Sequence, residues 1–271
     1  WWNYHAPGTR ALLVEQWGED YRVLIGQTVS DSEIEMMPGS PDACQHVLPS
    51  VYIDMIFPVS GWIGIDGFES ERTDAFVSPI LRTGRKLVFG RNSKLFGIRF
   101  DAVHVDRLYA VSPSELVQGP NDLASCLKIE LANSMMEIVE TTPGFVLRSQ
   151  RIDNVIRKHL VQEPDAHKSI CTFALEFIRS NPHTKVRDLS RSTGYSSRWI
   201  ERLFMENLGT TPQEIIRITR FNRFISHLQT SDFSNLASLA SECGYYDQSH
   251  LIRDFRSFAP ASPSELPSSF Q

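Results

Sequence analysis

The chain has 271 residues, of which 41% are hydrophobic and 22% charged, a composition that argues against disordered and fibrous proteins. It contains no run of about 18 apolar residues, so no membrane-spanning segment is predicted. The net charge of −5 is uneven: residues 168–271 hold 12 Lys and Arg against 10 Asp and Glu, and residues 1–167 hold 15 against 22, which favours two halves with separate roles.

The first hundred residues alternate short apolar runs with turn residues. Segments containing Gly or Pro at 38–41, 66–67, 83–84 and 90–92 separate these runs. Several short strands at this spacing predict a β-sandwich or barrel. The predicted strands are 12–14, 21–25, 51–57, 62–65, 86–89 and 95–100.

The pattern becomes helical after residue 121. Apolar residues recur at a helical spacing over 122–139, and a second helix is predicted over 145–160, after the break at Pro143-Gly144. Residues 162–167 are polar and contain a proline. We therefore expect an α+β protein with a β-rich sensing or dimerisation domain over 1–145, a helical linker over 146–167 and an all-α domain over 168–271.

Six helices are predicted after the linker. Gly194, Gly209 and Gly244 each follow a helix as a C-terminal stop, and Pro212 suits the first turn of the longest helix. The predicted helices are 170–179, 186–192, 196–207, 211–229, 235–243 and 247–258.

This helical half contains an internal repeat. Gly194-Tyr195 and Gly244-Tyr245 lie 50 residues apart, and each pair joins a short helix to a second helix with a capping residue, Ser196 or Asp247. Helix-turn-helix proteins place the N-terminal polar residues of such second helices on base edges in the major groove. A solvated polar face is the alternative for either unit alone. The candidate DNA-binding residues are Ser196, Ser197, Arg198, Glu201, Arg202, Asp247, Gln248, Ser249, His250 and Arg253.

The helix between the two units has a suitable length for one face of a DNA duplex. Its 19 predicted residues span about 28 Å, close to the roughly 34 Å between successive major-groove openings. Arg217, Arg220 and Arg223 on this spacer are candidates for phosphate contacts or for ion pairs at the edge of the core.

These segments resemble AraC/XylS-type transcription regulators over about residues 170–266. The resemblance is carried by residues 194–204, 209–212 and above all 244–255. It implies sequence-specific binding to double-stranded DNA and recruitment of RNA polymerase. The stretches 46–50, 54–57 and 95–100 are more distantly similar to the cupin-like β-domain of some of these regulators. Ala259-Pro260 departs from the family, which has a glycine in this final turn.

Three roles are open for the N-terminal half. It binds a small effector, with Trp17, Tyr52, Trp62, Arg99 and His104 as candidates, or it forms a homodimer through the stripe Leu123, Leu127, Leu131 and Met135. The third role, a metal-dependent cupin-type enzyme, needs clustered imidazoles and a carboxylate.

Neither metal nor catalytic residues are predicted. His5, His46 and His104 are isolated, and no nucleophile stands in a recognisable setting, so we expect no metal site, no cofactor and no enzymatic activity. Cys44, Cys126, Cys171 and Cys243 lie far apart, which suits a reducing cytoplasm.

Overall fold

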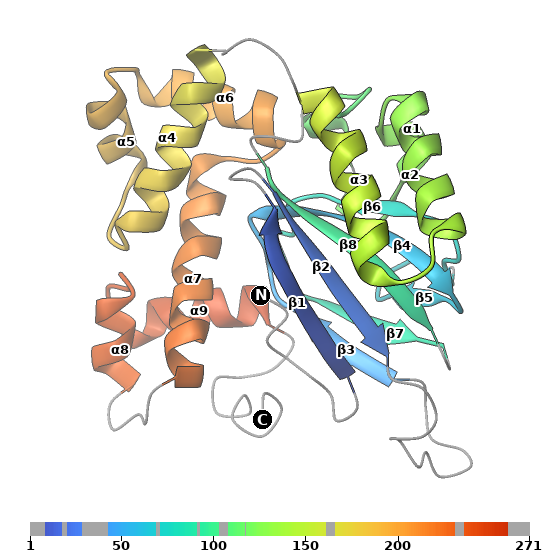
Figure 1. The fold of residues 1–271 in the computed structure, drawn as a ribbon. Helices are drawn as coiled ribbons and strands as arrows, with labels where there is room; N and C mark the ends of the chain where they lie inside the picture. Colours follow the sequence, from blue (N-terminus) through green and yellow to red (C-terminus); the bar gives the residue numbers. More distant parts are fainter. Residues whose placement is uncertain are drawn as a thin grey trace.

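The structure is a computed structural model with a β-rich part and a helical part side by side (Figure 1). It describes residues 9–17, 21–28, 43–68, 71–90, 93–102, 108–116, 118–160, 166–230 and 236–259, and before Val47 it describes the backbone only. The expected α+β architecture is confirmed.

The β-rich part consists of two antiparallel sheets. The strand order of the first sheet is β1 (Thr9–Trp17), β2 (Tyr21–Thr28), β8 (Lys94–Asp101), β4 (Tyr52–Ser60), β6 (Phe76–Ser78) and β9 (Asn121–Asp122). The second sheet has the order β3 (Ala43–Val47), β7 (Arg85–Phe89) and β5 (Ile63–Ile65).

Strand β4 lies inside the molecule, which explains why residues 53–57 are apolar apart from Asp54. Ile56 belongs to a cluster with Ile63, Phe76 and Leu87, so this side of β4 packs on the second sheet. Met55 and Phe57 belong to a different cluster, which includes the helices. Because both faces of β4 are covered, residues 53–57 are all buried and show no alternation with polar residues.

All six predicted strands occur, but three further strands were missed and one predicted helix is two. β3, β6 and β9 were not predicted. The expected helix over 122–139 is divided into α1 (Leu123–Cys126) and α2 (Ile129–Thr141), because Leu127 is extended and pairs with Tyr109. The apolar spacing continues across this interruption, so the pattern alone did not reveal it.

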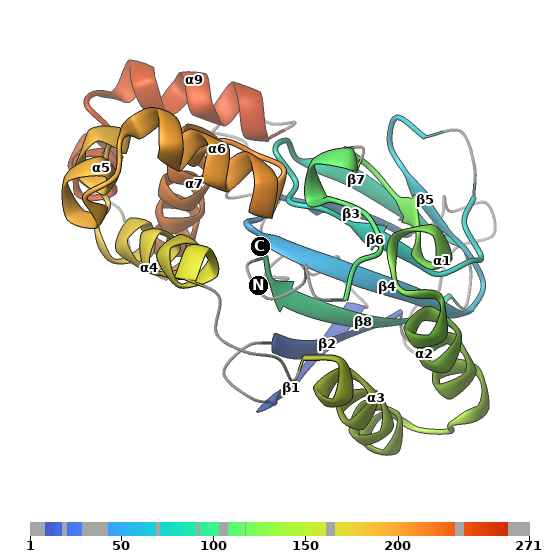
Figure 2. The ribbon, with the colours of Figure 1, turned by 90° about the horizontal axis from the view of Figure 1, so that it is seen from above.

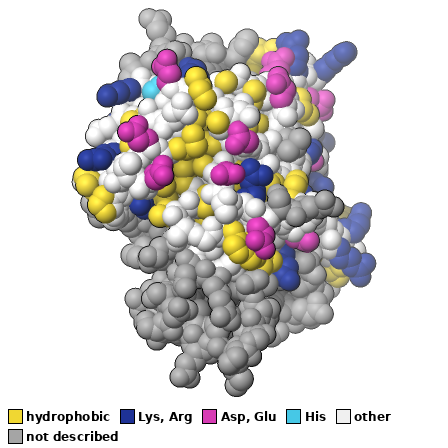
Figure 3. Space-filling view, turned by 90° about the vertical axis from the view of Figure 1, so that its right-hand side faces the viewer, with side chains coloured by type: hydrophobic (Ala, Val, Ile, Leu, Met, Phe, Trp, Pro, Cys, Tyr) yellow, Lys and Arg dark blue, Asp and Glu magenta, His cyan; other side chains and the backbone are white. Residues whose placement is uncertain are grey.

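The helices of the β-rich part cover the first sheet. α2 packs beside α3 (Phe145–Leu160) and against β4 (Figures 1 and 2). The stripe predicted as a dimer interface is wrong in that role, because its members lie in the chain's own core: Leu123, Leu127, Leu131 and Met135 are at most 1% exposed. On the opposite side of α2, Ile129 and three glutamates are exposed, and the face at the right of Figure 1 carries hydrophobic side chains among acidic ones (Figure 3).

The helical part follows its predicted order closely. A short segment outside the described residues separates it from α3. It consists of α4 (Ala166–Ser180), α5 (Val186–Thr193), α6 (Ser197–Leu208), α7 (Pro212–Thr230), α8 (Leu236–Glu242) and α9 (Gln248–Phe258). In the described part of the chain, no helix is long and apolar enough to cross a membrane.

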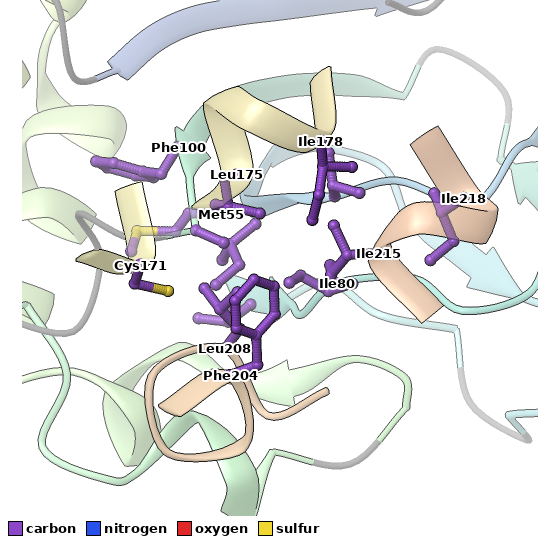
Figure 4. Packing of buried hydrophobic residues seen from close by; sticks show 14 of the residues in the cluster. Met55, Ile80, Phe100, Cys171, Leu175, Ile178, Phe204, Leu208, Ile215 and Ile218 are labelled. Atoms are coloured by element: carbon purple, nitrogen blue, oxygen red, sulfur yellow. The ribbon is translucent and has the colours of Figure 1, made fainter. Parts of the chain in front are cut away.

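One hydrophobic core joins the two parts. Met55, Ile80 and Phe100 of the β-rich part belong to the same buried cluster as Leu175 and Phe204 of the helical part (Figure 4). The helical part is therefore docked on the β-rich part through buried apolar surface rather than tethered beside it.

Candidate DNA interface

The first helix-turn-helix unit consists of α5, a sharp corner and α6. Gly194 ends α5 with a φ of 77°, a left-handed conformation that side chains with a Cβ rarely adopt. The hydroxyl of Ser196 then accepts a hydrogen bond from the backbone N–H of Trp199 at 3.3 Å. This cap fixes where α6 begins.

The second unit repeats this design with α8 and α9. Gly244 has a φ of 89°, and a Cβ there would lie 2.2 Å from the carbonyl oxygen of Pro182. Asp247 caps α9 by accepting from the backbone N–H of His250 at 2.7 Å. Both predicted caps are therefore present in the structure.

The corners differ by one residue. The cap follows Tyr195 directly in the first unit, whereas Tyr246 stands between Tyr245 and the cap in the second. The second helices therefore correspond at a separation of 51 residues, not the 50 that relates the glycines, so Arg202 corresponds to Arg253. Tyr246 is 93% exposed.

Most of the predicted reading residues lie on exposed surface. Arg202 lies 3.9 Å from Glu206 on the surface, and Nε of the exposed Arg253 donates to the backbone carbonyl of Ser249 at 3.4 Å. Neither guanidinium is buried. Ser197 is half-buried. The exposed predicted residues are Ser196, Arg198, Glu201, Arg202, Asp247, Gln248, Ser249 and Arg253.

His250 is placed differently from this exposed set. Its imidazole makes an edge contact with the ring of Tyr245 at 5.2 Å, and Nε2 is 3.5 Å from Nη1 of Arg220. Burial and nearby Arg220 lower the pKa of His250, although Asp254 opposes this shift. Trp199 occupies the corresponding position in α6 and packs against the core. His250 therefore faces α7.

Three side chains on the outer faces were not predicted. Met205 and Ile252 are 40% and 36% exposed, although both are apolar, and Arg256 is also exposed. Counting three residues on from Arg202, Ser249 and Arg253 leads to these positions, so helical spacing was the available signal.

The arginines of the spacer helix α7 bind within the chain. Nε and Nη2 of Arg217 donate to Oδ1 of Asp254 at 3.0 and 2.8 Å. Arg220 is 8% exposed, and burial lowers its pKa. Arg223 donates to the backbone carbonyl of Arg179. Of the two predicted roles for these side chains, contacts inside the domain fit the structure and phosphate contacts do not.

The two reading helices share an orientation. In Figure 1 α6 lies near the upper end of α7 and α9 near its lower end; in Figures 1 and 2 both run in the same general direction, and their C-terminal ends point toward the β-rich part. α7 has 19 residues, which corresponds to about 28 Å. The arrangement can present two helix N-termini to one face of a duplex.

The effector candidates are only partly brought together. Tyr52 and Arg99 lie side by side, with the guanidinium 5.5 Å from the ring centre, whereas Trp62 lies beyond the other end of β4. Trp17 ends β1, but its side chain lies outside the described residues, as does all of His104.

A cavity of about 60 Å³ lies between the sheets and has room for roughly four water molecules or a small ligand group. Arg99 donates to both carboxylate oxygens of Asp54, from Nε at 2.6 Å and from Nη2 at 2.7 Å. Burial lowers the pKa of Arg99, but the nearby Asp54 outweighs this effect, so the net pKa of Arg99 is raised. The walls are mostly apolar: they include Val47, Leu48, Ile56, Ile63, Ile65, Phe76, Leu87 and Leu95.

Metal-ligating and reactive groups are not clustered in the described part of the chain. No group of three His, Cys, Asp or Glu side chains there could hold a metal ion. Cys126, Cys171 and Cys243 are buried. Burial raises the pKa of Cys126 and Cys243 to about 11, which makes them poor nucleophiles.

Comparisons with known proteins single out the same region. Residues 189–268 match the family model described as a helix-turn-helix domain. No curated protein matches the sequence. The match covers both units, from α5 to beyond α9, and confirms the resemblance predicted from the two Gly-Tyr corners.

Solved structures also align with most of the chain, at low identity. ToxT from Vibrio cholerae is 12% identical, with a TM-score of 0.46 over 86% of this chain and 95% of that one. ToxT bound to an unsaturated fatty acid is 13% identical, with a TM-score of 0.43 over 93% and 96%. The AraC-like activator CuxR is 14% identical, with a TM-score of 0.32 over 90% and 93%.

Proposed function

We propose that this chain is a sequence-specific DNA-binding transcription regulator of the AraC/XylS type, because residues 189–268 match the family model described as a helix-turn-helix domain. The observation that carries the proposal is the pair of capped, exposed helix N-termini on α6 and α9, held apart by one spacer helix. Each helix enters one of two successive major grooves. Residues 168–271 are the DNA-binding domain, 146–167 the linker and 1–145 the sensing or dimerisation domain.

The exposed side chains match the chemistry of base edges. Arg198, Arg202 and Arg253 can each donate two hydrogen bonds to guanine, and Gln248 can bind adenine in the same manner. Glu201 can accept from cytosine. His250 lies on the inner side of α9, in contact with Arg220 and Tyr245. The regulator acts on transcription by recruiting RNA polymerase, as the family resemblance implies.

Substitution of a reading residue tests this function. We expect Arg202→Ala and Gln248→Ala each to weaken binding of the preferred duplex by about 1–3 kcal/mol and to relax preference at one base pair. A preferred duplex is first selected with the full chain from a random library. Anisotropy titrations at several salt concentrations then give affinities, and all active variants should show a steep salt dependence.

Matched controls remove the same kinds of group, a cation and an amide, from α3. Lys158→Ala and Gln150→Ala remove an exposed cation and an exposed amide far from α6 and α9, so both should bind as the wild type does. Equal affinity of all four variants would contradict the assignment of the reading helices, and affinity independent of salt would contradict DNA binding itself.

We further propose that the inter-sheet cavity receives a small, largely apolar effector, since its walls are mostly hydrocarbon and its polar groups are few. A homodimer is a second candidate mode of control, but through a surface other than the buried stripe of α1 and α2. A metal-dependent enzyme has no ligand cluster in the described residues to support it.

An apolar probe tests the cavity. Xenon under pressure, an apolar probe smaller than benzene, should raise the melting temperature of the full chain, because a ligand that binds only the folded state stabilises it. Ser78→Leu adds carbon atoms to a cavity-lining position on β6, so it should abolish the shift. A shift of the same size in this variant, with circular dichroism confirming its fold, would place xenon elsewhere.

A further inference from the structure

The cavity and the helical part share a wall. Residues of three segments line the cavity: Val47, Leu48 and Ser50 of the first, Ser78, Leu81 and Arg85 of the second, and Gly119 and Pro120 of the third. Asn222 of α7 donates from its amide to the carbonyl oxygen of Pro49 at 3.0 Å. The guanidinium of Arg82 lies 3.7 Å from the carboxylate of Glu214, also on α7. Two of the three wall segments therefore also touch the helical part on their other side.

The turn before β7 makes a third contact with the helical part, at the end of the second reading helix. The backbone N–H of Gly84 donates to the carbonyl oxygen of Phe258 at 3.0 Å. Phe258 is the last residue of α9, and its carbonyl has no partner within the helix. The β-rich part thus caps the C-terminus of α9.

Close approach explains the glycine at this contact. A Cβ at position 84 would lie 2.4 Å from the carbonyl oxygen of Phe258 and 3.2 Å from that of Val47. Phe258 in turn packs on Phe221 at 5.2 Å and under the guanidinium of Arg217 at 4.8 Å. A displacement at Gly84 therefore acts on the packing between α9 and the spacer helix.

On its other side the same turn contributes residues to the cavity wall and is hydrogen-bonded to Ser50 and Gln118. Leu81 and Arg85 line the cavity, and they flank Gly84 in sequence. Ser50 donates from its backbone to the carbonyl of Leu81 at 3.0 Å. The side-chain oxygen of Gln118 accepts from the backbone N–H of Arg82 at 3.2 Å, and the backbone carbonyl of Gln118 accepts from Nη2 of Arg85 at 3.0 Å. An occupant that displaces Leu81 or Arg85 has to move this bonded turn with it.

We propose that the turn 81–84 transmits the state of the inter-sheet cavity to the second reading helix. The inference rests on the proposed DNA-binding function. The docked arrangement is the DNA-binding form, because the β-rich part holds α9 at its C-terminus while Gln248, Ser249 and Arg253 at the other end stay exposed. Filling the cavity loosens the contact at Gly84 and weakens reading by α9 alone.

Gly84→Ala tests the contact in the full chain. The added methyl group should separate Gly84 from Phe258 and lower affinity for the selected duplex by about fivefold or more. Affinity for a duplex with a scrambled α9 half-site should not change. Gly64→Ala is the matched control, because its Cβ meets only ordinary contacts at 3.4 Å or more within the second sheet.

A double-mutant cycle tests the link to the cavity. Ser78→Leu should also lower affinity for the intact duplex, and it should have no further effect in the Gly84→Ala background. If Gly84→Ala loses the wild-type circular dichroism, Arg82→Ala with Asn222→Ala replaces it, because these changes remove two contacts without a steric clash.

The outcomes separate the two proposals. A wild-type chain that selects no duplex contradicts the proposed function itself. A wild-type chain that binds, together with Gly84→Ala equal to Gly64→Ala or with additive effects of Gly84→Ala and Ser78→Leu, leaves the function intact and overturns the transmission through this turn.

Discussion

Replacing Asp54 with alanine should destabilise the β-rich part by about 3–5 kcal/mol, because it leaves a buried arginine without its counter-charge. The side chains of Asp54 and Arg99 are 12% and 13% exposed, and two short hydrogen bonds join them. After the substitution, the cation–π contact with the ring of Tyr52 stabilises the charge of Arg99 less than the carboxylate did. The free energy of unfolding in urea, followed by circular dichroism, measures the loss.

A second substitution distinguishes an unpaired charge from an empty space. Asp54→Ala combined with Arg99→Leu removes both charges, and we expect it to recover a large share of the lost stability. If the double variant is less stable than Asp54→Ala, the cost comes from packing and not from the isolated guanidinium.

Asp254→Ala should have a comparable effect on the DNA-binding domain, about 3–5 kcal/mol. The Asp254 side chain is 4% exposed, accepts two hydrogen bonds from Arg217 and lies near the buried Arg220. Its removal leaves Arg217 and Arg220, two neighbouring cations of α7, without this carboxylate. Urea unfolding of the full chain, followed by fluorescence and circular dichroism, measures the change.

The first helix-turn-helix unit suggests the control. Leu203 stands in α6 where Asp254 stands in α9, so an apolar residue is compatible with this position in the fold. Asp254→Leu together with Arg217→Met should therefore be closer to the wild type than Asp254→Ala is. A loss of less than about 1 kcal/mol for Asp254→Ala would show that the pair is solvated and of little consequence.

Much of the helical part was predictable because its signals are local. The periodic apolar positions, the caps Ser196 and Asp247 and the positive-φ glycines all act within one or two turns, and the predicted helix 186–192 ends within one residue of the end of α5. Strands β6 and β9 carry no such signal. They are three and two residues long, and they form only because a neighbouring strand provides a partner: β4 for β6, and β6 for β9.

The site was predictable where exposure follows helical spacing and not where distant residues determine it. Asp254 is a charged residue in an amphipathic helix, and its burial depends on Arg217, 37 residues earlier in the chain. The inward position of His250 depends on Tyr245 and Arg220 in the same way. The cavity has no sequence signature, because ordinary strand residues from several strands form its walls.

The extra tyrosine in the second corner has a consequence for exchanging sequence preference between the two units. An α-helix turns by about 100° per residue, so residues transferred by counting from Gly194 and Gly244 would arrive one position out of phase. Arg202 would then be grafted onto Ile252 rather than Arg253. Chimaeric regulators of this kind have to be aligned on Ser196 and Asp247, the residues that fix the start of each reading helix.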